Sequence, residues 1–220
     1  MRFLFLGLVV LLSSQNTFSQ ERNDIGVLAG SSYYMGDFNL STQFYQPSPA
    51  IGVLFRHNLN EFYSLKLSGT HGNLKGYYNP NNQYLPQIPY QSFEQSFRAF
   101  DKRLVEISGA IEIGLRPFGT KPVDANSISP YVTLGVSLAI IDRDLLVNIP
   151  FGVGVKYTPF NRWTFGAEWR LHKTFNDNID YYPTHPNQSF RIHNFDWVGI
   201  GGLFVSYRLV NKGAICPAYD

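Results

Sequence analysis

The sequence predicts an all-β protein, an eight-stranded antiparallel, up-and-down transmembrane β-barrel with a side-chain-filled interior. Three observations carry this prediction. Eight segments alternate apolar and polar residues with period two. Short and long connections alternate between them, as in outer-membrane barrels. Aromatic residues make up 16% of the chain and charged residues only 15%, a composition that favours strands over helices.

The first four segments carry apolar residues at most alternate positions, with mainly small or polar residues between them. The clearest is 103–115, where Glu106, Ser108 and Glu112 alternate with the apolar side chains. Each segment is long enough for a tilted strand to cross a bilayer. Their apolar positions include Ile25, Val27 and Ala29 in 24–35; Ile51, Val53 and Phe55 in 49–57; Tyr63, Leu65 and Leu67 in 62–72; and Val105, Ile107 and Ile111 in 103–115.

The last four segments repeat this pattern and end in the strand that would close the barrel. That closing strand, 196–209, has a polar end on one face and an aromatic and aliphatic stripe on the other. Strand-end aromatics are typical of the girdles at membrane interfaces. The apolar positions include Val132, Leu134 and Val136 in 129–140; Phe151, Val153 and Val155 in 149–157; Trp163, Phe165 and Trp169 in 163–172; and Trp197, Val205 and Tyr207 in the closing strand.

The connections indicate how the barrel lies in the membrane. Segments 58–61 and 158–162 are short and 116–128 is intermediate, whereas 36–48, 73–102, 141–148 and 173–195 are longer, polar and rich in aromatics. Outer-membrane barrels have short periplasmic turns and long outer loops. An even number of strands then places both termini in the periplasm. A soluble, lipocalin-like barrel is the alternative, but its polar faces would carry a denser coat of Lys and Glu.

The chain ends are predicted to lie outside the barrel. Residues 1–19 resemble a signal peptide: Arg2 precedes a short apolar run, and Thr17, Phe18 and Ser19 form a plausible cleavage site. The barrel then spans 20–209, and 210–220 form a periplasmic C-terminal tail. No apolar run is long enough for a transmembrane helix. The formal charge of +2 gives no reason to expect a nucleic-acid partner.

Charged residues on the polar faces would share the barrel interior. Eight strands leave room for side chains but not for a channel, so we expect a paired ionic plug rather than a proton or ion path. The expected members of this interior charge network are Arg56, Lys66, Glu106, Glu112, Lys156, Glu168, Arg170 and Arg208.

The sequence predicts no enzyme and no metal or cofactor site. Glu168 and His172 share a face, but they lie about 13 Å apart along a strand, too far for a hydrogen bond. No Gly-x-Ser-x-Gly nucleophile motif is present. The histidines and aspartates of the last long loop, among them His185 and His193, follow no recognised metal-ligand spacing.

Cys216 is the single cysteine of the chain and lies in the tail, next to Pro217. An odd cysteine in an exported protein suggests an intermolecular disulfide or a reactive thiol, and the periplasm is oxidising. A tail beyond the last strand cannot bury this thiol in the barrel wall. We therefore expect Cys216, with Pro217 and Tyr219, to contact a partner.

Three stretches give the chain a family resemblance: residues 36–40 (Gly-Asp-Phe-Asn-Leu), 207–209 (Tyr-Arg-Leu) and 215–219 (Ile-Cys-Pro-Ala-Tyr). In these it resembles PorG-type proteins, outer-membrane barrels of the Bacteroidetes type IX secretion and gliding machinery. The resemblance implies a structural role beside a periplasmic ring built from PorK, a lipoprotein, and PorN. It makes Cys216 the candidate for covalent attachment to a PorK-like partner.

The expected function is therefore to anchor a periplasmic assembly of the secretion machinery to outer-membrane lipid. The alternative is an autonomous small barrel that binds a ligand or lipid through its long outer loops, where aromatic residues gather between 77 and 90.

Overall fold

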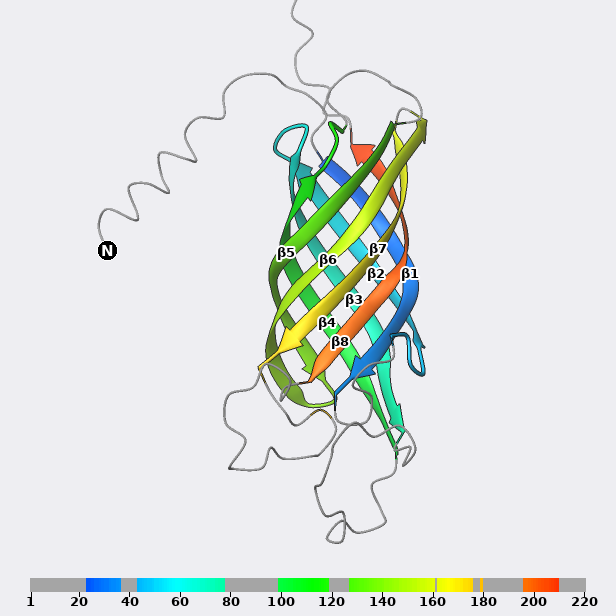
Figure 1. Ribbon diagram of the computed structural model, residues 1–220, viewed down its shortest axis with the longest axis vertical. Coiled ribbons are helices and arrows are strands. Elements are labelled where there is room, and N and C mark those ends of the chain that lie inside the picture. Colours follow the sequence, from blue (N-terminus) through cyan, green and yellow to red (C-terminus); the bar gives the residue numbers. More distant parts are fainter. Residues whose placement is uncertain are drawn as a thin grey trace, which may run out of the picture.

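A computed structural model describes residues 23–36, 43–77, 99–118, 127–160, 162–175, 179 and 196–209. These residues form one closed barrel of eight strands, each antiparallel to both neighbours (Figure 1). The predicted signal peptide and the predicted tail with Cys216, Pro217 and Tyr219 lie outside the described residues. The strands are β1 (Asn23–Met35), β2 (Ser48–Asn58), β3 (Tyr63–Tyr77), β4 (Ala99–Gly114), β5 (Ser127–Ile141), β6 (Asp144–Phe160), β7 (Trp163–Thr174) and β8 (Trp197–Leu209).

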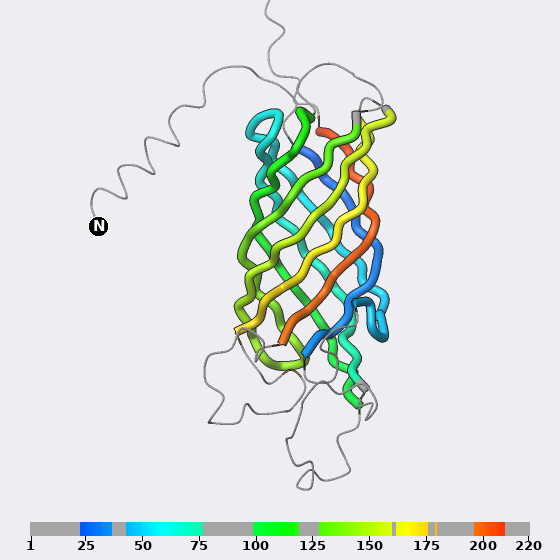
Figure 2. Tube along the Cα trace, in the orientation of Figure 1, coloured from blue at the N-terminus to red at the C-terminus, as the bar shows by residue number. Residues whose placement is uncertain are grey.

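The barrel closes between its first and last strands. Asn23 pairs with Leu209 and Met35 with Trp197, so β1 and β8 are in register along their whole length. Figure 2 shows that the strands are tilted relative to the barrel axis. β1 begins and β8 ends at the same end of the barrel, where the short β2–β3 and β6–β7 connections also lie. We call this end the terminal end. The opposite end is the loop end.

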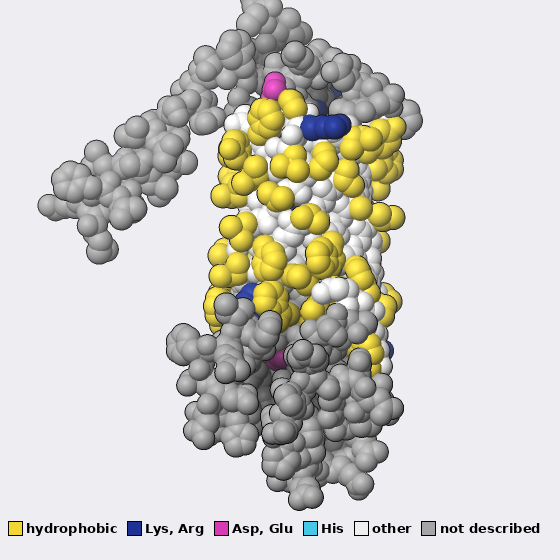
Figure 3. All heavy atoms as spheres, viewed as in Figure 1, with side chains coloured by type: hydrophobic (Ala, Val, Ile, Leu, Met, Phe, Trp, Pro, Cys, Tyr) yellow, Lys and Arg dark blue, Asp and Glu magenta, His cyan; other side chains and the backbone are white. Residues whose placement is uncertain are grey.

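The outer wall is apolar along most of the barrel height. Leu203, Val136 and Ile51 have 68%, 65% and 63% of their surface exposed, and similar side chains cover the visible wall (Figure 3). Aqueous surfaces rarely carry so large an apolar belt, whereas lipid-facing barrel walls require one. The prediction of a membrane-type barrel, with apolar faces outward, is confirmed. No helix among the described residues is long and apolar enough to cross a membrane.

Aromatic pairs mark both ends of this belt. At the terminal end, the rings of Trp163 and Tyr207 meet edge to face with centroids 5.1 Å apart. At the loop end, the ring of Trp197, the first residue of β8, meets Phe151 from the middle part of β6 in the same way at 5.8 Å, and the Lys173 ammonium lies 4.5 Å from the Trp197 ring centroid. Such amphipathic rings favour the level of the lipid headgroups.

The β5–β6 connection differs from the prediction. A long loop over 141–148 is wrong, because β5 runs to Ile141 and β6 begins at Asp144. Leu145 and Val147 continue the outward apolar positions, so the alternation does not stop there. Asp142 adopts a positive φ of 58°, a conformation that Asp tolerates better than most residues, and this permits the tight turn.

Residues 43–46, in the part of the β1–β2 connection that the structure describes, lie over the outside of the wall. Tyr33 points outward by strand parity and yet is fully buried, because Phe44 packs on its ring at 4.8 Å between centroids. The Tyr33 hydroxyl donates to Gln43 Oε1 at 2.6 Å and accepts from Trp169 Nε1 at 2.7 Å. Beneath it lies Gly199, where an added Cβ would approach the Tyr33 ring to 2.0 Å. We call residues 43–46 the strap.

Candidate functional site

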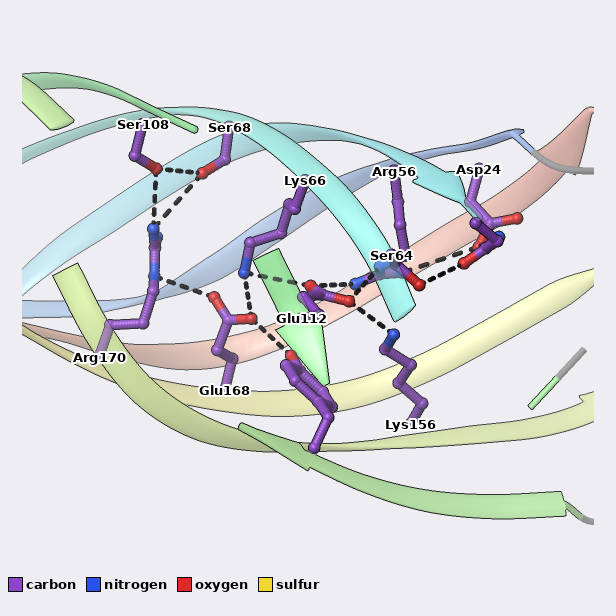
Figure 4. A network of polar contacts seen from close by, with 12 residues as sticks. Asp24, Arg56, Ser64, Lys66, Ser68, Ser108, Glu112, Lys156, Glu168 and Arg170 are labelled. Atoms are coloured by element: carbon purple, nitrogen blue, oxygen red, sulfur yellow. Dashed lines mark hydrogen bonds and ion pairs between the residues drawn. The ribbon is translucent and has the colours of Figure 1, made fainter. Parts of the chain in front are cut away.

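The most distinctive chemistry of the described residues is inside the barrel. Strand parity turns all eight predicted charges inward, and each of them is buried. Figure 4 shows Arg56, Lys66, Glu112, Lys156, Glu168 and Arg170, whose contacts run as one chain from Asp24 to Ser108. Small inward residues such as Gly52, Gly135 and Gly152 leave space for these long side chains, as expected for a barrel of this size.

Glu112 on β4 is the first centre of this network. Its carboxylate accepts two hydrogen bonds from Arg56 of β2, at 2.8 and 3.2 Å. Lys156 of β6 lies 2.6 Å away and Lys66 of β3 lies 3.3 Å away. One carboxylate therefore ties together four strands, and its charge compensates three cations that burial alone would make costly.

Glu168 on β7 is the second centre. It forms an ion pair with Lys66, which thus bridges the two centres. Arg170 Nε lies 2.9 Å from Glu168 Oε1, and the Tyr131 hydroxyl donates to Oε2 at 2.5 Å. Charge-assisted contacts of this kind are the stronger ones in a low-dielectric interior.

Asp24 extends the network to the terminal end and was missed by the sequence analysis. It lies 3.3 Å from Arg208 Nε and 3.8 Å from Arg56 Nη1. Both arginines face it directly in the register, on either side of β1. The available signal was parity: Asp24 precedes Gly26 by two residues and shares its inward face.

His172 of β7 finds its carboxylate partner, Glu106, on β4 and not on its own strand, where the sequence analysis had considered Glu168. His172 Nδ1 lies 2.8 Å from Glu106 Oε2, across from β7, while Glu168 pairs elsewhere. Arg170 connects this pair to the rest, at 3.7 Å from Glu106 and with a hydrogen bond of 3.1 Å to Ser108 Oγ. Ser108 in turn contacts Ser68 at 2.8 Å.

Residues 2–218 match the family model described as "Domain of unknown function (DUF6089)". The chain belongs to the DUF6089 family. No curated protein matches it.

Solved structures share the fold of this DUF6089 protein. Neisserial surface protein A is 12% identical with a TM-score of 0.50, covering 85% of this chain and 97% of that one. Ail, the attachment invasion locus protein of Yersinia pestis, is 12% identical with a TM-score of 0.48, covering 86% and 100%. The outer membrane protein OprG of Pseudomonas aeruginosa is 9% identical with a TM-score of 0.45, covering 86% and 97%. At 12% identity and a TM-score of 0.50, the likeness to Neisserial surface protein A concerns the fold alone.

Both ends of the interior of this DUF6089 barrel are covered. Towards the loop end, an apolar cluster fills the lumen below the charges. At the terminal end, Phe118 of the β4–β5 connection is buried over the mouth, 5.4 Å from Lys156 Nζ and 5.9 Å from the Arg208 guanidinium. The apolar cluster consists of Tyr34, Leu74, Phe100, Leu104, Ala139, Ile141, Leu146, Ile179, Val198 and Ile200.

The interior arrangement is suited to cross-linking strands rather than to transferring groups. The Ser68 and Ser108 hydroxyls are held by each other and by Arg170. Within the described part of the chain, no three His, Cys, Asp or Glu side chains are grouped so as to hold a metal ion. Each charged centre instead joins strands that are not neighbours in the sheet.

Proposed function

We propose that this protein is a non-enzymatic outer-membrane component that anchors a periplasmic assembly. The observation that carries the proposal is the filled lumen, with ion pairs along its height, an apolar cluster at the loop end and Phe118 at the other. A barrel filled in this way serves as a membrane fixture rather than as a conduit for secreted polypeptides.

The chain ends supply the attachment. Because Asn23 pairs with Leu209, the chain enters and leaves the barrel at the terminal end, beside the short connections. We assign this end to the periplasm, following the usual placement of short turns. Cys216 follows Leu209 closely, so an extended tail would keep its thiol within about 25 Å of the rim.

The resemblance to PorG-type proteins supports an assembly of the type IX secretion system as the one that is anchored. On this proposal the partners are a PorK-like lipoprotein and a PorN-like ring protein of the type IX secretion system. Cys216 would form a disulfide with the partner, and Pro217 and Tyr219 would contact it.

Non-reducing electrophoresis of outer membranes tests the proposal. We expect a reductant-sensitive adduct larger than the monomer, which Cys216→Ser abolishes, together with impaired secretion. A matched Ser206→Ala variant, which changes an inward side chain near the end of β8, keeps the adduct. A protein that runs as a monomer under both conditions, with secretion intact in Cys216→Ser, excludes the tether.

A second candidate function rests on the loop end. The β3–β4 hairpin projects beyond the other strands there (Figures 1 and 2). It carries the exposed ion pair of Lys75 and Asp101, 3.2 Å apart. A surface receptor that binds a ligand or lipid through its loops would lose binding when residues 79–91 are deleted, whereas an anchor acting from the periplasm would keep secretion.

A further inference from the structure

Four polar side chains form one layer of the interior, between the ion-pair centres and the apolar cluster. Glu106, Ser137, Asn148 and His172 face inward from the consecutive strands β4, β5, β6 and β7, and all are buried. Ser137 and Asn148 face each other in the register. The contact of 2.8 Å between Glu106 and His172 closes the layer from β4 to β7. We call it the Glu106–His172 layer.

This layer contains polar atoms that the protein itself leaves without hydrogen bonds. Among the described residues, Asn148 Oδ1, Asn148 Nδ2, Ser137 Oγ and His172 Nε2 have no hydrogen-bond partner, and each has less than 1 Å² exposed. Glu106 Oε1, Glu106 Oε2 and His172 Nδ1 also lack a hydrogen bond, although the Glu106 carboxylate and the His172 ring lie within ion-pair distance. Asn148 is the most informative, because its whole amide is buried and unpaired. Buried amides are hydrogen-bonded in nearly all native proteins, so a partner is required here.

The layer is shut off on both sides. Two positions towards the loop end on the same strands lie Leu104, Ala139 and Leu146 of the apolar cluster. On the other side, Arg170 spans to Ser68 and Ser108. Bulk solvent therefore has no open route to Asn148 through the described residues, and any partner must be a resident of the interior.

We propose that the Glu106–His172 layer binds a cluster of ordered water molecules. The unpaired atoms include both a donor, Asn148 Nδ2, and an acceptor, Asn148 Oδ1, and the Ser137 hydroxyl can act as either. A cation bound here would leave the Asn148 Nδ2 donor unsatisfied, and an anion would leave the Asn148 Oδ1 acceptor unsatisfied. Water satisfies both, and buried water usually makes about three such bonds.

The charge of the interior supports a neutral ligand. The interior ion pairs join five cations to four carboxylates, so a further cation would add to an existing excess. An anion in the layer would lie against Glu106. The cations are Arg56, Lys66, Lys156, Arg170 and Arg208, and the carboxylates are Asp24, Glu106, Glu112 and Glu168.

Nuclear magnetic resonance of the isotope-labelled barrel in detergent micelles tests the proposal. Magnetisation transfer from water to the Asn148 side-chain amide is measured, with Asn148→Leu identifying the signals. We expect strong cross-peaks of the sign given by long-lived bound water. The exposed amide of Asn73 serves as the matched control, with only the transfer of short-lived surface hydration.

Absence of water transfer to an observed Asn148 amide overturns the proposal. Where line broadening hides these signals, the unfolding midpoint of Asn148→Leu, compared with that of the unmodified protein, distinguishes a hydrated layer from a dry one. Removing a dry, unpaired amide in favour of a side chain of similar volume would raise the midpoint. Removing a member of a hydrated layer leaves the water cluster with a missing partner and lowers it, and a raised midpoint therefore excludes bound water.

Discussion

Lys66 on β3 and Glu168 on β7 form a buried ion pair between strands that lie opposite each other in the closed sheet. Lys66 also lies 3.3 Å from Glu112, so the two carboxylate centres are joined through one ammonium. Neighbouring strands are held by their backbone ladders, whereas these side chains hold opposite walls. The network therefore fills the lumen and fixes the cross-section of the barrel at the same time.

Glu112→Gln is expected to destabilise the barrel by about 3–5 kcal/mol, because it leaves buried cations uncompensated. Among the described carboxylates, Glu112 is the one within ion-pair distance of Lys156. Thermal unfolding in detergent, followed by circular dichroism, measures the loss. Adding Lys156→Met to Glu112→Gln restores part of the stability, since one of the three cations that Glu112 compensates is then gone as well.

An exposed pair provides the control for this prediction. Lys75 and Asp101 lie 3.2 Å apart with 46% and 54% of their side chains exposed. Lys75→Met is expected to change stability by less than about 1 kcal/mol, because solvent screens the pair. Equal losses from Glu112→Gln and Lys75→Met would contradict the role given to the interior network.

Gly199→Ala is expected to displace the strap. The added Cβ would lie 2.0 Å from the Tyr33 ring, which two hydrogen bonds and Phe44 hold in place. Overpacking of this kind costs about 1–3 kcal/mol. The indole N–H resonance of Trp169 reports the result, because it loses its bond to Tyr33.

Gly109→Ala is the matched control, since nothing lies within 4 Å of its added Cβ on the outer wall. We expect its Trp169 resonance and its stability to equal those of the unmodified protein. An unchanged Trp169 resonance in Gly199→Ala would mean that Tyr33 does not need the glycine beneath it.

Leu134→Arg is expected to destabilise the membrane-inserted barrel more than Leu145→Arg. Both leucines point outward with similar exposure, 60% and 66%, but Leu134 lies at the middle of β5 and Leu145 beside the β5–β6 turn. An arginine costs about 2–4 kcal/mol at the bilayer midplane and about 0–1 kcal/mol near the interface. Equilibrium unfolding from lipid vesicles measures the difference, and equal costs would place the bilayer elsewhere on the wall.

The sequence predicted which way the side chains face better than what they contact. Period-two alternation assigned Glu112 and Lys156 to the interior, because parity is a local property. Their contact depends on the tilt and stagger of eight strands, which no local pattern contains. For the same reason His172 was compared with Glu168 on its own strand, while the structure pairs it with Glu106.

Two further differences also have physical causes. The β3–β4 hairpin is longer than predicted, since β3 runs to Tyr77 and β4 begins at Ala99. The prediction stopped short because the outer face of this part carries Asn73, Lys75 and Asp101 instead of apolar residues. Beyond the apolar belt, strands continue without the alternation that identifies them. Strand parity alone puts Tyr33 on the outer face, but its burial depends on the strap, a segment from outside the strand.

Conductance of the purified barrel in planar lipid bilayers tests the filled interior most directly. With Lys66 and Glu168 paired across the lumen, and both ends covered, we expect no stepwise ion current in the unmodified protein. The Lys66→Ala, Glu168→Ala double variant, which removes the crossing pair, serves as the comparison. Reproducible open-channel steps from the unmodified protein would contradict a closed barrel and, with it, the role of a membrane anchor.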